Sequence, residues 1–349
     1  MRICEGKDKK YVVSEKKLAQ LKGILKLLIM PKGLKAGQTL YECTTGYQWL
    51  FYTAILCTVY RDKPEKRRYE TGVLEISRKN FKTFSVATLF ILLILTEPPE
   101  TLMYSVAPDG ALSKLVKEAL ASILRASPMV YEHKGKKHFK ILRDYIEFRP
   151  NRSQVVPLSY STSRLDGRVV SVYLADEIGA LPNSYAIEAM KSGQVTSPNK
   201  LGILASTKYP TIQNPLEEEV VFSKRVLDGT EKDESRFSLL YEPDKTKGWE
   251  TDDLILKQAN PVALEIPEIW EDLVKKRARA IAMESVRENF VTKHCNIVYQ
   301  GAGTETYVDV KDVQACKTAH IDWKGKVVYL GLDLSETNDN TSVSMVALG

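Results

Sequence analysis

A basic loop ends in an adjacent lysine and threonine, Lys82 and Thr83, in the sequence Ile76-Ser-Arg-Lys-Asn-Phe-Lys-Thr83. The loop lies between a predicted strand and a predicted helix, where the free amide groups of the helix N-terminus can bind an anion. Lys82 would reach the β and γ phosphates of a nucleotide, and the Thr83 hydroxyl would ligate Mg²⁺. An ordinary basic turn is the alternative, because Ile76 and Phe81 occupy the positions of the two glycines in the common phosphate loop.

Two adjacent carboxylates, Asp176 and Glu177, follow an apolar, β-forming run from Val169 to Ala175. Parallel sheets bind ligands at the carboxyl ends of their strands, which is where these acids would stand. Asp176 would hold Mg²⁺ through its water shell, and Glu177 would polarise the water that attacks the γ phosphate. A strand that runs into an acid-capped helix is the alternative. The position of the acids downstream of the loop, with one further strand between, favours ATP hydrolysis.

A pair of hydroxyls, Ser206 and Thr207, closes the apolar stretch Ile203–Ala205 one strand–helix unit after the carboxylates. Hydroxyls at this place could sense a γ phosphate, although a Ser-Thr pair at a strand end more commonly caps a helix. The pair therefore points to nucleotide chemistry only in combination with the loop and the carboxylates.

These residues require a sheet whose strands end at one common edge. From about residue 71 to residue 206, β-rich runs alternate with helical periods, which is typical of an α/β fold with a parallel sheet covered on both faces. The predicted strands are Gly72–Ile76, Thr101–Ala107, Val169–Ala175 and Leu201–Ala205. The predicted helices between them are Thr83–Leu95, Leu112–Arg125 and Ser184–Gln194.

Four segments are predicted along the chain. Residues 1–40 form an N-terminal segment with an amphipathic helix over Ser14–Met30, and residues 41–212 form the core that contains the sheet. Residues 213–320 form a charged lid or linker subdomain with helices at Asn214–Leu227, Thr251–Ala259 and Pro267–Lys293. Residues 321–349 form a hairpin from the strands Lys326–Leu334 and Ser342–Leu348, with which another domain would begin.

The composition is that of a globular protein with a basic excess. The net charge is +6, and basic residues cluster at Arg61–Arg68, Lys134–Lys140 and Lys275–Arg279. These clusters suit a phosphate-backbone partner, although they are also typical of solvated faces. The five cysteines form no CxxC pair, so neither a zinc site nor a disulfide framework is expected. No signal peptide is recognised and the strongest apolar run, Phe84–Leu95, is too short to cross a bilayer, so a cytoplasmic location is expected.

Together the motifs resemble those of terminase large subunits of the tailed-phage head-assembly type. The loop Ser77–Thr83 is similar to their R-K-N-G-K-[ST] loop, and Leu165-Asp-Gly167 with Leu174–Glu177 is similar to their L-D-G and D-E motifs. Gly46–Trp49 resembles their glutamine motif, and Val106–Pro108 resembles the strand after their first helix. Ser206-Thr207 is similar to their coupling motif. The segment Gly331–Ser335, with Asn338 and Asp339 after it, is similar to the first strand and turn of their RNase H-like nuclease.

The resemblance implies a P-loop NTPase of the ASCE type, followed by a helical linker and the first hairpin of an RNase H-like domain. Gln48 would orient adenine, and Arg78 would contact phosphate or stabilise transition-state charge. The nucleotide-binding loop would comprise Ser77, Arg78, Lys79, Asn80, Phe81, Lys82 and Thr83. An arginine finger that acts on a neighbouring subunit is also implied, with Arg149, Arg152, Arg164 and Arg168 as candidates.

The function implied by the resemblance is that of an ATP-hydrolysing motor subunit that translocates double-stranded DNA into the prohead. The implied partners are ATP with Mg²⁺, the DNA, the portal protein and the small terminase subunit. The implied assembly is a homo-oligomeric ring in the cytoplasm of the bacterial host, built from subunits that are monomeric alone.

Two departures from the family pattern lead to alternatives. Phe81 replaces a glycine that needs unrestricted φ or space beside the phosphate, so we expect ATP binding to be weakened or lost. A non-catalytic remnant that keeps the fold is therefore an alternative, and another P-loop ATPase such as a helicase is a further one. An RNase H-like nuclease gathers several carboxylates around two metals, and Asp333 is the only one of that set expected here, since Asp339 is a turn former. We therefore expect neither Mg²⁺ or Mn²⁺ binding at a nuclease site nor DNA cleavage.

Overall fold

The computed structural model describes residue 3 and residues 6–160, 165–299, 314–318, 322–333 and 342–347. It contains two compact units, Met1–Tyr299 and Gln300–Gly349. The predicted nucleotide site lies entirely in the first unit.

An eight-stranded sheet forms the centre of the first unit, in the order β12-β3-β11-β10-β4-β9-β8-β7. Neighbours from β12 to β9 run parallel, whereas β9, β8 and β7 are successively antiparallel. Because β11 pairs with both β3 and β10, the segments that follow these three strands emerge together at one edge. The strands are β3 (Thr71–Glu75), β4 (Leu102–Ala107), β7 (Phe139–Ile141), β8 (Ile146–Phe148), β9 (Ser153–Ser159), β10 (Val172–Asp176), β11 (Leu201–Ser206) and β12 (Arg236–Leu240).

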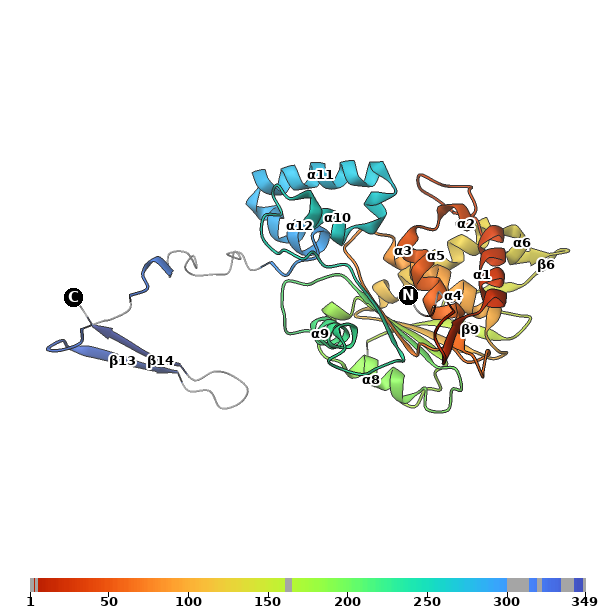
Figure 1. Cartoon of the computed structure of the whole chain (residues 1–349), viewed down its shortest axis with the longest axis horizontal. Helices are drawn as coiled ribbons and strands as arrows, with labels where there is room; N and C mark the ends of the chain where they lie inside the picture. Colours follow the sequence, from red (N-terminus) through yellow and green to blue (C-terminus); the bar gives the residue numbers. More distant parts are fainter. Residues whose placement is uncertain are drawn as a thin grey trace. The chain divides into compact units, whose positions relative to one another are not determined.

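Helices cover both faces of the sheet (Figure 1). Successive strand residues point to opposite faces, so Leu174 and Ile203 contribute to one core while Tyr173 and Leu204 contribute to the other. The first core is covered by α1 (Glu15–Leu27), α3 (Gly46–Tyr52), α4 (Lys82–Thr96), α5 (Gly110–Ala126) and α6 (Pro128–Tyr131). The second core is covered by α8 (Tyr185–Ser192) and α9 (Pro215–Asp228).

Helix α4 occupies the middle of the first core. Every side chain from Ser85 to Ile94 is buried, because the helix is apolar on almost all sides and must pack inside the protein. No helix in the described part of the chain is long and apolar enough to span a membrane. The burial of α4 holds its first residue, Lys82, in a fixed position at the edge of the sheet.

A helical subdomain follows the sheet and consists of α10 (Asp253–Ala259), α11 (Pro267–Ala282) and α12 (Arg287–His294) (Figure 1). Short 3₁₀ turns, η3 (Pro261–Leu264) and η4 (Glu284–Val286), connect its helices. The subdomain has its own small core, which includes Trp249, Leu256, Phe290 and Cys295. This core gives α12 a rigid base from which it can contact the sheet.

Smaller elements complete the first unit. The pair β1 (Tyr11–Val13) and β2 (Thr58–Tyr60) is antiparallel, as is the pair β5 (Glu132–His133) and β6 (Lys136–Lys137). The others are α2 (Leu40–Cys43), the π-helical turn η1 (Thr53–Cys57) and the 3₁₀ turn η2 (Ile178–Ala180).

The predicted strands and helices of the core are confirmed with small shifts at their ends, and three features differ. Strand β12 extends the sheet beyond residue 212, into the segment predicted as a linker; it is short, only half-buried and without a clear alternation. The antiparallel strands β7 to β9 were not predicted. The single helix predicted over Pro267–Lys293 is broken, because Met283 takes an extended conformation between α11 and α12.

The second unit contains the predicted hairpin. Strands β13 (Val328–Asp333) and β14 (Ser342–Ala347) are antiparallel, with Val328 opposite Ala347 and Asp333 opposite Ser342. The turn between these strands lies outside the described residues.

Candidate functional site

The predicted phosphate loop connects β3 to α4 at the carboxyl edge of the sheet. Two of its residues have left-handed backbone, Lys79 with φ 76° and Phe81 with φ 58°. The Phe81 carbonyl accepts hydrogen bonds from the Ser85 amide and hydroxyl, which joins the loop to the first turn of α4. Phe81 therefore adopts the conformation for which a glycine would be favoured, and its side chain is 40% exposed.

Lys82 contacts both predicted acids. Its Nζ lies 2.5 Å from Asp176 Oδ1 and 2.7 Å from Glu177 Oε1, although the lysine and the first acid are 94 positions apart in the chain. Lys82 and Asp176 are buried, and Glu177 is partly buried. The structure thus brings the loop and the acid pair together at one edge of a single sheet, as predicted.

The charges at this edge are coupled. Burial opposes the charged form of Lys82, but Asp176 and Glu177 outweigh it and raise the pKa of the ammonium. Burial raises the pKa of Asp176, against the attraction of Lys82. Burial also opposes ionisation of Glu177, yet Lys82 and Lys293 outweigh it and lower that pKa. An ionised Glu177 beside a charged lysine can accept a proton from a water molecule.

Glu177 combines an unusual backbone conformation with a hydrogen-bonded side chain. Its backbone is left-handed, with φ 53° and ψ 43°, in a non-glycine residue. The Tyr209 hydroxyl donates a 3.1 Å hydrogen bond to its Oε2. Uncommon backbone geometry of this kind persists only where surrounding contacts stabilise it, and it clusters at functional sites.

The hydroxyl pair at the end of β11 is buried beside the acids. Ser206 Oγ accepts a 3.2 Å hydrogen bond from the Gly179 amide and donates to the Thr207 carbonyl. Thr207 Oγ1 lies 3.3 Å from Nζ of Lys293, a residue of α12. The predicted sensor pair therefore connects the segment after Glu177 with the helical subdomain.

A buried amide network ties the loop to the same subdomain. Asn260, between α10 and η3, accepts hydrogen bonds through Oδ1 from Ser77 Oγ at 2.5 Å and Asn80 Nδ2 at 2.9 Å. Its own Nδ2 donates to the carbonyls of Leu256 and His294. Ser77 and Asn80 thus shape the loop from inside, with their side chains turned away from solvent.

Gln48 is buried next to α4. Its Oε1 accepts from the Thr45 amide at 2.9 Å, and its Nε2 donates to Ser85 Oγ at 2.7 Å. The neighbouring Tyr47 hydroxyl donates to the Asn80 carbonyl. Contact between Gln48 and an adenine would require exchange of these internal bonds, so the adenine role stays a prediction.

The remaining predicted residues fall into three groups. Arg78 and Lys79 are exposed on the loop, and Thr83 is partly exposed at the start of α4. Arg149, Arg152 and Arg168 lie near the amino ends of the parallel strands, away from the acids, so the role of an arginine finger stays a prediction for them. Arg164, Asn338, Asp339 and the Asp333 side chain lie outside the described part of the chain.

A charged cluster lies behind the loop, at the end of β3. Lys208 Nζ is 3.2 Å from Glu75, 2.8 Å from Glu217 and 2.6 Å from Glu242. Asn296, which follows α12, donates a 3.1 Å hydrogen bond to Glu75. Burial raises the pKa of Glu75 to about 8. The cluster joins the sheet, α9 and the helical subdomain.

Sequence reasoning missed Tyr209, Asn260 and Lys293, which all contact predicted site residues. Tyr209 was detectable in principle, because it lies two positions after the Ser206-Thr207 pair. Asn260 and Lys293 stand in a charged helical stretch without a local motif, so no sequence signal distinguishes them.

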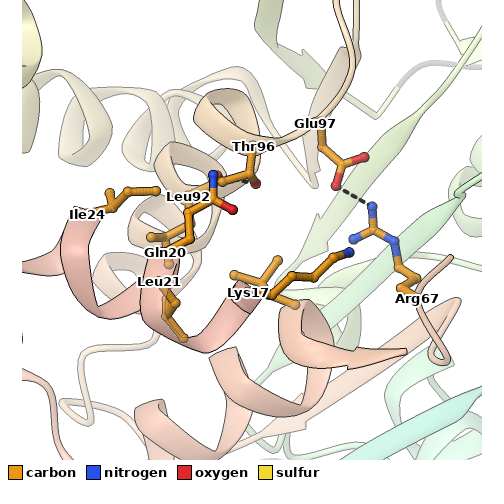
Figure 2. A pocket seen from close by; sticks show the side chains of 9 residues that line it. Lys17, Gln20, Leu21, Ile24, Arg67, Leu92, Thr96 and Glu97 are labelled. Atoms are coloured by element: carbon orange, nitrogen blue, oxygen red, sulfur yellow. Dashed lines mark hydrogen bonds and ion pairs between the residues drawn. The ribbon is translucent and has the colours of Figure 1, made fainter. Parts of the chain in front are cut away.

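A small cavity of about 60 Å³ lies away from this edge, between α1 and the C-terminal end of α4 (Figure 2). Lys17 and Leu21 line it on one side, and the 2.6 Å ion pair of Arg67 with Glu97 lines it on the other. It is separate from the acids and does not belong to the candidate site.

Comparisons with known proteins match both parts of the chain. A family model for the terminase large subunit, ATPase domain, matches residues 50–225. A second, for the terminase large subunit, endonuclease domain, matches residues 230–348. The endonuclease match begins well before residue 321, so more of the chain has nuclease-type sequence than predicted. No curated protein matches the chain.

Solved structures of large terminases are similar in fold. The HK97 bacteriophage large terminase has a TM-score of 0.64 at 20% identity, over 94% of this chain and 64% of its own length. The large terminase ATPase domain of a Thermus phage has a TM-score of 0.45 at 12% identity, over 66% of this chain and 89% of its own. The chain therefore spans 64% of the HK97 protein, whose fold it shares.

Proposed function

Because the chain belongs to the terminase large subunit family, we propose that it is an ATP-hydrolysing motor subunit that translocates double-stranded DNA into a phage prohead. The observation that carries this proposal is the contact of Lys82 with Asp176 and Glu177. These three side chains are the ones that phosphoryl transfer requires, one cation for the phosphates and two carboxylates for metal and water.

In the proposed reaction, Lys82 exchanges its contacts with the acids for the β and γ phosphates of ATP. The nucleotide binds with Mg²⁺, which neutralises phosphate charge, and Thr83 and Asp176 offer it the oxygen ligands that it prefers. Glu177, released from Lys82 and still held by Tyr209, orients the attacking water and accepts its proton. Exposed Arg78 stands on the loop, where it can add positive charge.

The DNA that is moved and the protein partners are proposed from the family. The duplex would be gripped through its phosphates, for which the basic clusters Arg61–Arg68 and Lys134–Lys140 are suited. A ring at a portal protein, together with a small terminase subunit, would place Arg149, Arg152, Arg164 or Arg168 of one subunit at the site of the next.

One observation favours a second candidate, a non-catalytic remnant. Phe81 carries a phenyl ring, 40% exposed, at the loop position where the family pattern has a glycine. If the ring excludes the nucleotide, the chain keeps its fold and its assembly contacts without hydrolysis.

Phosphate release from ATP·Mg²⁺ by the unmodified chain, Phe81→Gly and Glu177→Ala tests the proposal. We expect release by the unmodified chain and a loss of about 10²- to 10⁴-fold in Glu177→Ala, because that change removes the general base. Release by Phe81→Gly alone would support the remnant. Release that is insensitive to Glu177→Ala would contradict the proposed site.

A further inference from the structure

Lys293 is a buried cation without a carboxylate partner. The residue is 6% exposed, and no ion pair joins it to any carboxylate in the described part of the chain. Its Nζ donates to the Lys208 carbonyl at 2.6 Å and to Thr207 Oγ1 at 3.3 Å. Neutral oxygens compensate a buried ammonium only in part, so this position favours the arrival of an anion.

The ammonium also lies against the side chain that holds Glu177. Its Nζ is 3.2 Å from the centre of the Tyr209 ring, whose hydroxyl bonds to Glu177 Oε2. A cation at a ring face is attracted by the π electrons, so the positions of Lys293 and Tyr209 are coupled. A displacement of Lys293 would therefore move Tyr209, and through the Tyr209 hydroxyl it would move the carboxylate of Glu177.

Lys293 is joined to the phosphate loop by its backbone as well. Its carbonyl accepts a 2.7 Å hydrogen bond from the Arg78 amide. Repulsion from Arg78 and Lys82 adds to the effect of burial, and the pKa of Lys293 falls to about 8 despite the attraction of Glu177. Arg78, Lys82 and Lys293 thus repel one another at the loop, and the carboxylates of Asp176 and Glu177 lie beside Lys82.

We propose that Lys293 is the residue through which the helical subdomain senses the terminal phosphate of the bound nucleotide. With a triphosphate present, its ammonium exchanges Thr207 and the Lys208 carbonyl for oxygens of the γ phosphate. Loss of that phosphate returns it to Thr207. Because Lys293 is part of α12, this exchange moves the subdomain relative to the loop, and Tyr209 transmits the same exchange to Glu177.

This inference rests on the proposed function, and it makes a specific claim about nucleotide discrimination. A lysine that contacts only the γ phosphate stabilises ATP but not ADP. One charged hydrogen bond of this kind corresponds to about a 10- to 100-fold difference in affinity. Lys293→Met should therefore weaken ATP·Mg²⁺ binding by that factor and leave ADP·Mg²⁺ binding unchanged. A purely structural lysine would alter both affinities together.

Calorimetric titration of ATP·Mg²⁺ and ADP·Mg²⁺ tests this, in the unmodified chain and in a Phe81→Gly background. Lys293→Arg keeps the charge and should retain a preference for ATP. Lys257→Met is the matched control, because Lys257 is an exposed lysine of the same subdomain and lies over the Trp270 ring. Thermal melting of each variant reports on folding.

The outcomes separate the two proposals. A reduced ATP preference in Lys293→Met, with Lys257→Met unchanged, supports the sensor. An equal ATP-to-ADP ratio in Lys293→Met and the parent chain, or a reduced ratio in Lys293→Arg as large as that in Lys293→Met, overturns the sensor alone. Absence of nucleotide binding in both backgrounds overturns the sensor and the proposed ATPase together.

Discussion

The left-handed backbone of Phe81 leads to a prediction about stability. Phe81 has φ 58° and ψ 24° at the start of α4. This conformation costs a residue with a Cβ about 1 to 2 kcal/mol, whereas glycine adopts it freely. The ring is 40% exposed, so its removal forfeits only part of the about 1.5 to 3 kcal/mol that full burial of a phenylalanine contributes.

These magnitudes separate two substitutions that both remove the ring. Phe81→Ala loses the packing and keeps the strain, so we expect it to lower the free energy of unfolding by about 1 to 2 kcal/mol. Phe81→Gly loses the same packing and relieves the strain, so we expect its stability to exceed that of Phe81→Ala by about 1 kcal/mol. Denaturant titration of the three proteins without nucleotide measures both differences.

Nucleotide titration of the same three proteins identifies the obstacle to ATP. If the ring is the obstacle, Phe81→Ala and Phe81→Gly should both bind ATP·Mg²⁺ more tightly than the unmodified chain. If the loop backbone needs the space of a missing Cβ, only Phe81→Gly should improve. Equal affinity in all three proteins would refute the idea that Phe81 weakens binding, and a glycine variant no more stable than the alanine variant would refute the strain argument.

Two further predictions concern the buried charges. Lys82→Met should lower the free energy of unfolding by about 3 to 5 kcal/mol, because it leaves Asp176 and Glu177 buried beside each other without their cation. Addition of Asp176→Asn should recover part of that loss in denaturant titrations, and additive effects would contradict the coupling. Glu75→Gln should flatten the pH dependence of stability: burial raises the pKa of Glu75 to about 8, so between pH 5 and 8 the folded chain keeps a proton that the unfolded chain releases. The free energy of unfolding of the unmodified chain should therefore fall as pH rises through that window. An identical slope of this free energy against pH in Glu75→Gln would contradict the interpretation.

Local sequence patterns predicted the main elements of the core well. The alternation of β-rich and helical runs predicted β3, α4, β4, α5, β10 and β11 with small errors at their ends. Strand β12 was not predicted, because five half-buried residues at a sheet edge produce neither an apolar run nor a clean alternation of apolar and polar residues. The break at Met283 also escaped prediction, because no proline or glycine stands there to mark the end of a helix.

The sequence by itself determined which residue types could do chemistry and at which strand ends they stand. Lys82 and the pair Asp176 and Glu177 were identifiable because strand ends and helix starts are properties of neighbouring residues. Their common edge followed from the rule that parallel strands end together. The absence of the loop glycine at Phe81 was equally visible.

Only the tertiary structure decided what surrounds these residues. Lys293 meets Thr207 across 86 positions, and Asn260 meets Ser77 across 183. Such contacts depend on how the helical subdomain packs against the sheet, and no pattern of neighbouring residues encodes that packing. The same holds for Phe81, whose backbone takes the left-handed form because the folded surroundings of the loop, rather than the residue's own preference, determine its φ.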